Sequence, residues 1–173
     1  MELNLTRPEL LDKFQQQHLA ILVYTGQLGE QQYVYSQEGK WTAGQQISHL
    51  FLCLQTISGA LASKTMIEGK FGLRTRKKMD YNEVIHTYKA GLQNGGKALE
   101  RFLPPPVTIE EKSLTEDSLR GILALLQLQH YTEDELDTYM LPHPFLGLLT
   151  IREFFYLMTF HASHHQEQIE KNL

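Results

Sequence analysis

Two histidines near the end of the chain have the spacing of a metal-binding pair. His161 and His165 stand four residues apart, so in a helix their imidazoles project from the same face, one turn above the other. Two imidazoles in this arrangement can bind a single metal ion, which is the geometry of helical His-x-x-x-His pairs. The alternative is a pair of core histidines satisfied by hydrogen bonds, because each unpaired buried group would cost roughly 1–3 kcal/mol. The spacing alone leaves both interpretations open.

A third candidate ligand comes from a segment that is apolar on nearly every side. His49 lies in this segment, so it is expected in the buried middle of the molecule. Cys53 follows His49 by one helical turn, and its thiolate can complete a metal site. The more common role of an unpaired cysteine, which we adopt, is that of a small buried hydrophobe. His18 lies on another apolar stripe and is assigned to the core, with a fourth metal ligand as the alternative.

The other histidines are interpreted as flanking, structural or exposed residues. His164 points about a third of a turn away from His165, so it is expected to support the pair rather than to join it. His86 and His130 fall at the edges of apolar stripes. His143 stands between two prolines and is expected to cap the turn before the last helix.

Helical spacing of apolar residues extends over almost every long segment, and it predicts the elements that position these side chains. Thr42 with Gln45, and Thr150 with Glu153, have the spacing of capping boxes. The last helix has the histidine pair on its apolar stripe. Helices are expected at Pro8 to Tyr24, from Thr42, from Asp80 to about Leu92, from about Thr115, and from Thr150.

Strand patterns are weak by comparison. Gln32 to Ser36 allows one short extended stretch, and Pro142 and Pro144 prevent a helix before the last one. Three prolines at residues 104–106 end an irregular crossover that is expected to lie outside the core. We therefore predict an all-α fold, a four-helix bundle with long crossover connections, in a single domain that spans residues 1–173.

The overall charge argues against a nucleic-acid-binding protein. The net charge is −4 and the pI is about 6.0, whereas a protein that binds a phosphate backbone needs a clustered excess of Lys and Arg. The one basic cluster, Arg74 to Lys78, is short and lies between polar stretches, so it is interpreted as a solvated loop.

The remaining bulk features favour a reducing compartment. Cys53 is the only cysteine, which excludes an intramolecular disulfide and a cysteine zinc cluster. Met1 to Asp12 lacks the apolar core of a signal peptide, and no stretch has the length of a membrane span. We expect a cytoplasmic protein without a membrane partner.

Two of the predicted helices have more apolar surface than a single contact with a neighbouring helix would bury. The segment that contains His49 is apolar on nearly every side, and the last helix adds an aromatic group made of Phe154, Phe155, Tyr156 and Phe160. Surplus apolar surface in a domain of this size predicts a helix-to-helix homodimer, the commonest closed assembly.

Three stretches of the chain share the order and the motifs of one known family. Trp41 to Leu50 (WTAGQQISHL) has a Trp and a Thr cap before a histidine at the start of a helix. His143 to Thr150 (HPFLGLLT) has the form His-Pro-x-x-Gly-x-Leu-Thr, and His161 to Ile169 (HASHHQEQI) has the form H-x-x-H-H-x-x-Q-I. Together, in this order, they resemble the DinB-like superfamily over Arg7 to Asn172.

The resemblance implies a four-helix bundle with unusual connections. It also implies a metal ion held by one histidine of the second helix and two of the last, which are His49, His161 and His165 in this sequence. The family includes metal-dependent thiol transferases, among them bacillithiol and mycothiol S-transferases, and a maleylpyruvate isomerase. The implied activity is the metal-dependent transfer of a small thiol to an electrophile, with these two small molecules as partners.

Three neutral imidazoles leave a divalent ion its full charge and at least one open coordination position, as in catalytic sites. Water in that position, with its pKa lowered to about 7, predicts a hydrolase, whereas a thiol there is deprotonated and predicts an S-transferase. A non-catalytic metal-binding bundle is the remaining alternative. We expect Zn or Ni, with Fe or Mn as alternatives. No catalytic residue is assigned, because nothing places Glu167 or Gln168 beside the metal.

Overall fold

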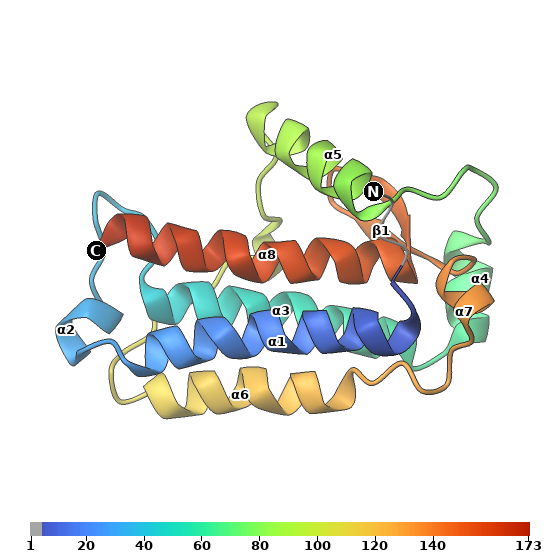
Figure 1. Cartoon of the computed structure of the whole chain (residues 1–173). Helices are drawn as coiled ribbons and strands as arrows, with labels where there is room; N and C mark the ends of the chain where they lie inside the picture. The colour runs from blue at the N-terminus through green and yellow to red at the C-terminus, as the bar shows by residue number, and fades with distance from the viewer. Residues whose placement is uncertain (1–4) are drawn as a thin grey trace.

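The computed structural model describes residues 5–173, and helices account for most of this part of the chain. The first four residues of the stretch Met1 to Asp12 lie outside the described residues. Four long helices lie side by side and form the body of the molecule (Figure 1): α1 (Arg7–Gly26), α3 (Ala43–Leu61), α6 (Lys112–Leu125) and α8 (Ile151–Asn172). α1 packs mainly against α8, and α3 mainly against α6. The predicted all-α class is confirmed.

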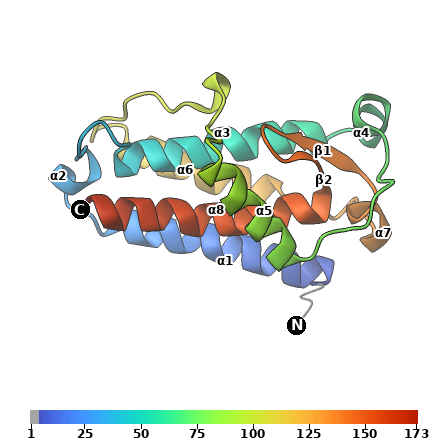
Figure 2. The ribbon, with the colours of Figure 1, turned by 90° about the horizontal axis from the view of Figure 1, so that it is seen from above.

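The directions of these four helices require one long crossover. α1 and α8 run one way along the bundle, whereas α3 and α6 run the opposite way (Figures 1 and 2). Since α3 and α6 are parallel, residues 62–111 between them must return along the bundle. This crossover contains α4 (Lys64–Phe71), α5 (Tyr81–Gln93) and the short 3₁₀ helix η1 (Glu100–Phe102). α5 packs against α8, so the crossover covers a side of the last helix.

Both predicted capping boxes are present at the starts of the helices that bear the histidines. The Gln45 amide donates to Thr42 Oγ1 at 3.1 Å, and the Thr42 amide donates to Gln45 Oε1 at 3.1 Å. At α8 the Glu153 amide donates to Thr150 Oγ1 at 3.2 Å, and the Thr150 amide donates to Glu153 Oε2 at 2.8 Å. These reciprocal bonds satisfy amides that the first helical turn leaves without a partner, so they fix where each helix begins.

The extended structure occurs at a different place from the one predicted. Strands β1 (Met140–His143) and β2 (Gly147–Thr150) form an antiparallel hairpin, in which Met140 pairs with Thr150 and His143 pairs with Gly147. Gly147 has a φ of 75°, which a glycine adopts without strain. The prediction for Gln32 to Ser36 is wrong, because α2 (Glu30–Tyr33) takes its first two residues and the other three form no strand. The Gly29 amide donates to Gln32 Oε1 at 3.0 Å and starts this short helix.

The basic segment from Arg74 to Lys78 is not simply a solvated loop. Arg76 forms two ion-pair contacts with Glu153, at 2.8 and 2.5 Å, and the carboxylate is 1% exposed. A paired Arg–carboxylate fork of this kind is stronger than an exposed contact of a single charge. Arg76 thereby attaches the crossover to the start of α8, and the prediction is wrong for this residue.

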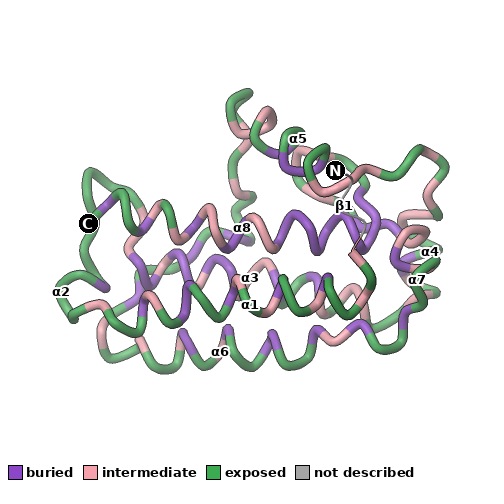
Figure 3. Tube along the Cα trace, viewed as in Figure 1, coloured by how far each residue is buried: buried purple, intermediate pink, exposed green. Residues whose placement is uncertain are grey.

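The most deeply buried part of the chain is the first half of α8. All residues from Ile151 to Met158 are buried (Figure 3). α1 lies on one side of this helix, and α5 and the hairpin pack against it as well. Phe154, Phe155 and Tyr156 are therefore covered within the chain, which accounts for much of the apolar excess. The homodimer stays a prediction.

Within residues 5–173, no single helix has both the length and the apolar composition to cross a membrane. α3 and α4 meet these criteria only as a pair, and they are bent by 98° relative to each other.

Candidate metal centre

Side chains from α3 and α8 bring three histidines together. The Nε2 atoms of His49 and His161 are 3.4 Å apart, and those of His161 and His165 are 2.9 Å apart. All three residues are buried, with at most 6% of their surface exposed. His161 and His165 lie one turn apart on α8, as their spacing predicts. The structure thus brings together all three of the predicted ligands.

Two hydrogen bonds turn these rings so that the Nε2 atoms face each other. His49 Nδ1–H donates to the carbonyl oxygen of Phe102 in η1 at 2.7 Å. His165 Nδ1–H donates to Oε1 of Gln46, which is itself buried on α3. Because these oxygens only accept, each bond holds the proton on Nδ1 and leaves the Nε2 lone pair free for a metal ion. Neither Gln46 nor Phe102 is among the predicted site residues. Gln46 precedes His49 by three residues, and this helical spacing is the sequence feature that identifies it.

The ring of the third imidazole, His161, lies beside both of the others, with centroids 5.1 Å from His49 and 4.3 Å from His165. His161 Nδ1 is buried and has no hydrogen-bond partner among the described residues. Its Nε2 faces the Nε2 atoms of His49 and His165, and their lone pairs repel unless a proton or a cation lies between them. A tetrahedral ion at about 2.0–2.1 Å from each nitrogen would separate two nitrogens by about 3.3–3.4 Å. The 3.4 Å between His49 and His161 matches this value, whereas the 2.9 Å between His161 and His165 is shorter. Three buried neutral imidazoles are a donor set that suits a divalent metal ion.

Burial keeps the three imidazoles in the form that binds metals. Loss of solvation lowers the pKa of His49, and it lowers the pKa of His161 and of His165 well below the ordinary value. The charges of the neighbouring histidines act in the same direction. The rings are therefore neutral near neutral pH, and neutral imidazole is the ligand form.

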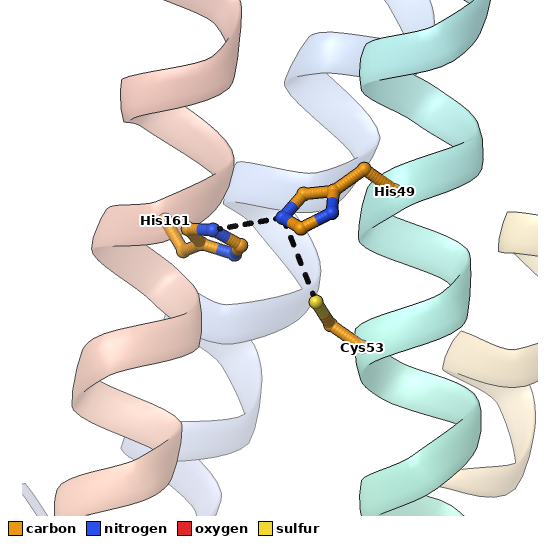
Figure 4. Close-up of side chains that lie close together, drawn as sticks. All are labelled: His49, Cys53 and His161. Atoms are coloured by element: carbon orange, nitrogen blue, oxygen red, sulfur yellow. Dashed lines mark hydrogen bonds between the residues drawn. The ribbon is translucent and has the colours of Figure 1, made fainter. Parts of the chain in front are cut away.

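Cys53 lies next to the histidines and offers a fourth ligand atom. Its Sγ is 3.6 Å from His49 Nε2, and the ligand atoms of His49, Cys53 and His161 all lie within 4.8 Å of one another (Figure 4). Sulfur at about 2.3 Å and nitrogen at about 2.0–2.1 Å from a tetrahedral zinc would be about 3.5 Å apart. Burial raises the pKa of the thiol to about 12, so without a cation beside it the thiol stays protonated. Cys53 packs against the core, as its interpretation as a small hydrophobe predicts, and its position also agrees with the alternative of a thiolate that completes a metal site.

A cavity of about 320 Å³ lies against the cluster. The three histidines and Cys53 line it, together with side chains from the crossover and the hairpin. The Trp41 ring stacks on His165 with its centroid 6.2 Å away, and it contacts His49 at 4.9 Å. The volume is within the range of ligand pockets, about 300–1,000 Å³. The aromatic residues in the wall are Trp41, Phe71, Tyr88, Phe102, Phe145 and Phe154.

The remaining histidines lie in three kinds of place. His18 is fully buried and does not line the cavity, and its Nδ1–H donates to the Phe14 carbonyl at 2.7 Å, which agrees with its assignment to the core. His86 and His130 are exposed. His143 belongs to β1 and accepts a long hydrogen bond, 3.5 Å, from the Phe145 amide within the hairpin. Both His143 and His164 also line the cavity, which the sequence does not predict.

Comparison with known proteins identifies a family for the chain. Residues 13–169 match the family model of the DinB superfamily. The match includes the three stretches that resemble this family and all three candidate ligands. Neither the curated proteins nor the solved structures yield a match.

Proposed function

The chain belongs to the DinB superfamily, and we propose that it is a metal-dependent transferase that activates a small thiol. His49, His161 and His165 are the proposed ligands of the ion. One observation supports this function above all. The Nε2 atom of buried His161 lies 3.4 Å from that of His49 and 2.9 Å from that of His165, and all three residues border a cavity large enough for a small substrate.

A divalent ion held by three neutral imidazoles supplies an undiminished double charge, which holds a bound thiol as thiolate at neutral pH. The residues of the chain have complementary tasks. Phe102 and Gln46 orient two of the rings, and the aromatic walls of the cavity limit the access of water to the site. In the proposed reaction the thiol would give its proton to solvent, and its sulfur would bond to an electrophilic carbon. The bond from that carbon to its leaving group would break, and the leaving group would depart with the electron pair. The ligand set suits Zn or Ni, with Fe or Mn as alternatives.

The hydrolase alternative has less support from the residues around the cavity. Metal-dependent hydrolases commonly pair the ion with a carboxylate that acts as general base. No Asp or Glu is among the residues that line this cavity in the described part of the chain. A thiol, in contrast, needs no base once a cation lowers its pKa.

A non-catalytic metal-binding protein is the second candidate, and the position of Cys53 favours it. Its Sγ lies 3.6 Å from His49 Nε2, where it can act as a fourth protein ligand. Four protein ligands close a metal site, whereas catalytic sites keep one position open. The two candidates therefore differ in whether Cys53 binds the ion.

Cobalt substitution and a turnover assay together test the proposed function. A thiolate ligand gives Co²⁺ an intense near-ultraviolet charge-transfer band. We expect this band to appear only after a thiol such as cysteine is added, and to be the same in Cys53→Ser. Turnover of a bimane electrophile should then require both the ion and the added thiol, and His161→Ala should abolish it. A band without added thiol that disappears in Cys53→Ser, together with no turnover, would support the non-catalytic candidate.

A further inference from the structure

The charged residues that line the cavity are all positive. Lys97 and Arg101 belong to the crossover, and both are exposed, so the cavity reaches the surface beside them. No acidic residue is part of the lining in the described chain. The protein as a whole has a net charge of −4, so the charge of the lining is opposite in sign to that of the whole protein.

Neither cation forms an ion pair with another of the described residues. Within residues 5–173, no carboxylate oxygen lies within 4.0 Å of the Lys97 or Arg101 side chain. The Arg101 guanidinium lies over the Phe102 ring at 4.7 Å. Phe102 is also the residue whose carbonyl orients His49. Arg101 is thus adjacent in the chain to the residue that orients His49, and its side chain lines the same cavity as the histidines.

The other polar groups of the lining do not offset these two charges. His143 and His164 also line the cavity, and an imidazole does not carry a negative charge. Burial raises the pKa of Tyr88, so its hydroxyl stays protonated. Most of the remaining wall is aromatic or aliphatic. The cavity therefore combines an apolar body with a positive mouth.

We propose that this cavity binds a small organic anion, with an aromatic or aliphatic body and one carboxylate-like group. The anionic group pairs with Lys97 and Arg101, since a guanidinium binds planar oxyanions through two parallel hydrogen bonds. The apolar body lies among the aromatic side chains, next to the histidine cluster. The inference rests on the proposed function in taking this molecule as the electrophile. A cavity of about 320 Å³ restricts it to a small molecule.

A matched pair of probes tests this inference without any turnover. Naphthoate and naphthalenemethanol have the same ring system, but only the first is an anion. Calorimetry should show that naphthoate binds more tightly, both to the metal-loaded protein and to protein treated with a chelator. The double variant Lys97→Gln/Arg101→Gln should lower the affinity for naphthoate about 10-fold, and leave the affinity for naphthalenemethanol unchanged.

A second double variant separates a local effect from one of net charge. Lys13→Gln/Lys77→Gln removes the same charge from exposed residues that do not line the cavity, and it should leave both affinities unchanged. The inference is overturned if wild type binds the probes equally or binds neither. It is also overturned if both double variants weaken naphthoate alike, or if naphthoate binding needs the metal and is insensitive to Lys97→Gln/Arg101→Gln. Because the chelated protein is tested too, failure of the thiol reaction does not decide the outcome.

Discussion

The two sides of α8 are packed in different ways. Toward α1 the helix forms a closely packed seam, where Phe155 is 1% exposed and its ring lies 4.7 Å from that of Phe14. Toward α3 the same helix presents His161 and His165 to His49, and the cavity lies against these residues. All of these side chains are buried, so burial alone does not distinguish the two sides. The difference lies in the space left beside them.

Histidines occur on both sides, and their hydrogen bonds differ. On α1, the His18 Nδ1–H donates to the Phe14 carbonyl of its own helix, and the two rings pack with centroids 4.4 Å apart. On the α3 side, His49 and His165 donate to acceptors on other elements. A ring bonded to its own helix fills a place in the core. A ring whose Nδ1–H bonds to a second element has a fixed orientation, so its Nε2 is held in one direction, as the binding of a metal ion requires.

Metal content should give the largest difference between the two sides. His49→Ala, His161→Ala and His165→Ala each remove one of three imidazoles, so we expect none of them to retain stoichiometric metal. Exposed His86 and His130 serve as controls, and their Ala variants should retain it. Elemental analysis after dialysis measures the outcome. Full metal with unchanged affinity in His49→Ala would contradict the three-histidine site.

Stability should depend more on the α1 side. Phe155→Ala leaves a cavity in a closely packed seam and should cost about 3–5 kcal/mol. Phe145→Ala removes a partly exposed ring from the wall of the existing cavity and should cost about 1–2 kcal/mol. Urea unfolding of the metal-free protein, followed by circular dichroism, measures both free energies. Equal losses of unfolding free energy in the two variants would contradict a larger contribution of the α1 side to stability.

Acid should lower the stability of the folded protein through His18, which lies on the α1 side. Burial lowers the pKa of this residue from 6.5 to about 4. The unfolded chain takes up a proton near pH 6.5 and the folded chain does so only near pH 4, so stability falls as the pH falls between these values. The loss due to this residue is about 3 kcal/mol. In metal-free protein, His18→Leu should remove that part of the pH dependence, whereas His86→Leu should leave the dependence as in wild type.

The smallest effect should come from the residue that orients a ligand. Gln46→Leu removes the acceptor of the His165 Nδ1–H bond, and we expect metal affinity to fall about 10- to 100-fold. Gln55→Leu changes an exposed glutamine on the same helix and should have no effect. Competition with a chromophoric chelator measures the affinities. Equal affinities in both variants would show that the ring keeps its orientation without Gln46.

Local features of the sequence predicted much of the fold. The bundle helices follow the apolar periodicity, and the capping boxes of Thr42 and Thr150 mark two of the helix starts. The hairpin and the Arg76–Glu153 ion pair escaped prediction because each joins segments with no local pattern of their own. α4 was missed as well. It is a short helix with Ile67 as its buried residue, so its apolar pattern is brief.

The sequence by itself determined that His161 and His165 share one face of a helix, because the helical repeat fixes the relation between residues four positions apart. The resemblance to a family added His49 to this pair. Only the tertiary structure decided how the rings are held. His49 bonds to a carbonyl 53 residues away, and His165 to an amide oxygen 119 residues away. The tertiary structure also placed Cys53, Lys97 and Arg101 around one cavity. Contacts over such separations depend on the path of the crossover, and no local repeat in the sequence encodes that path.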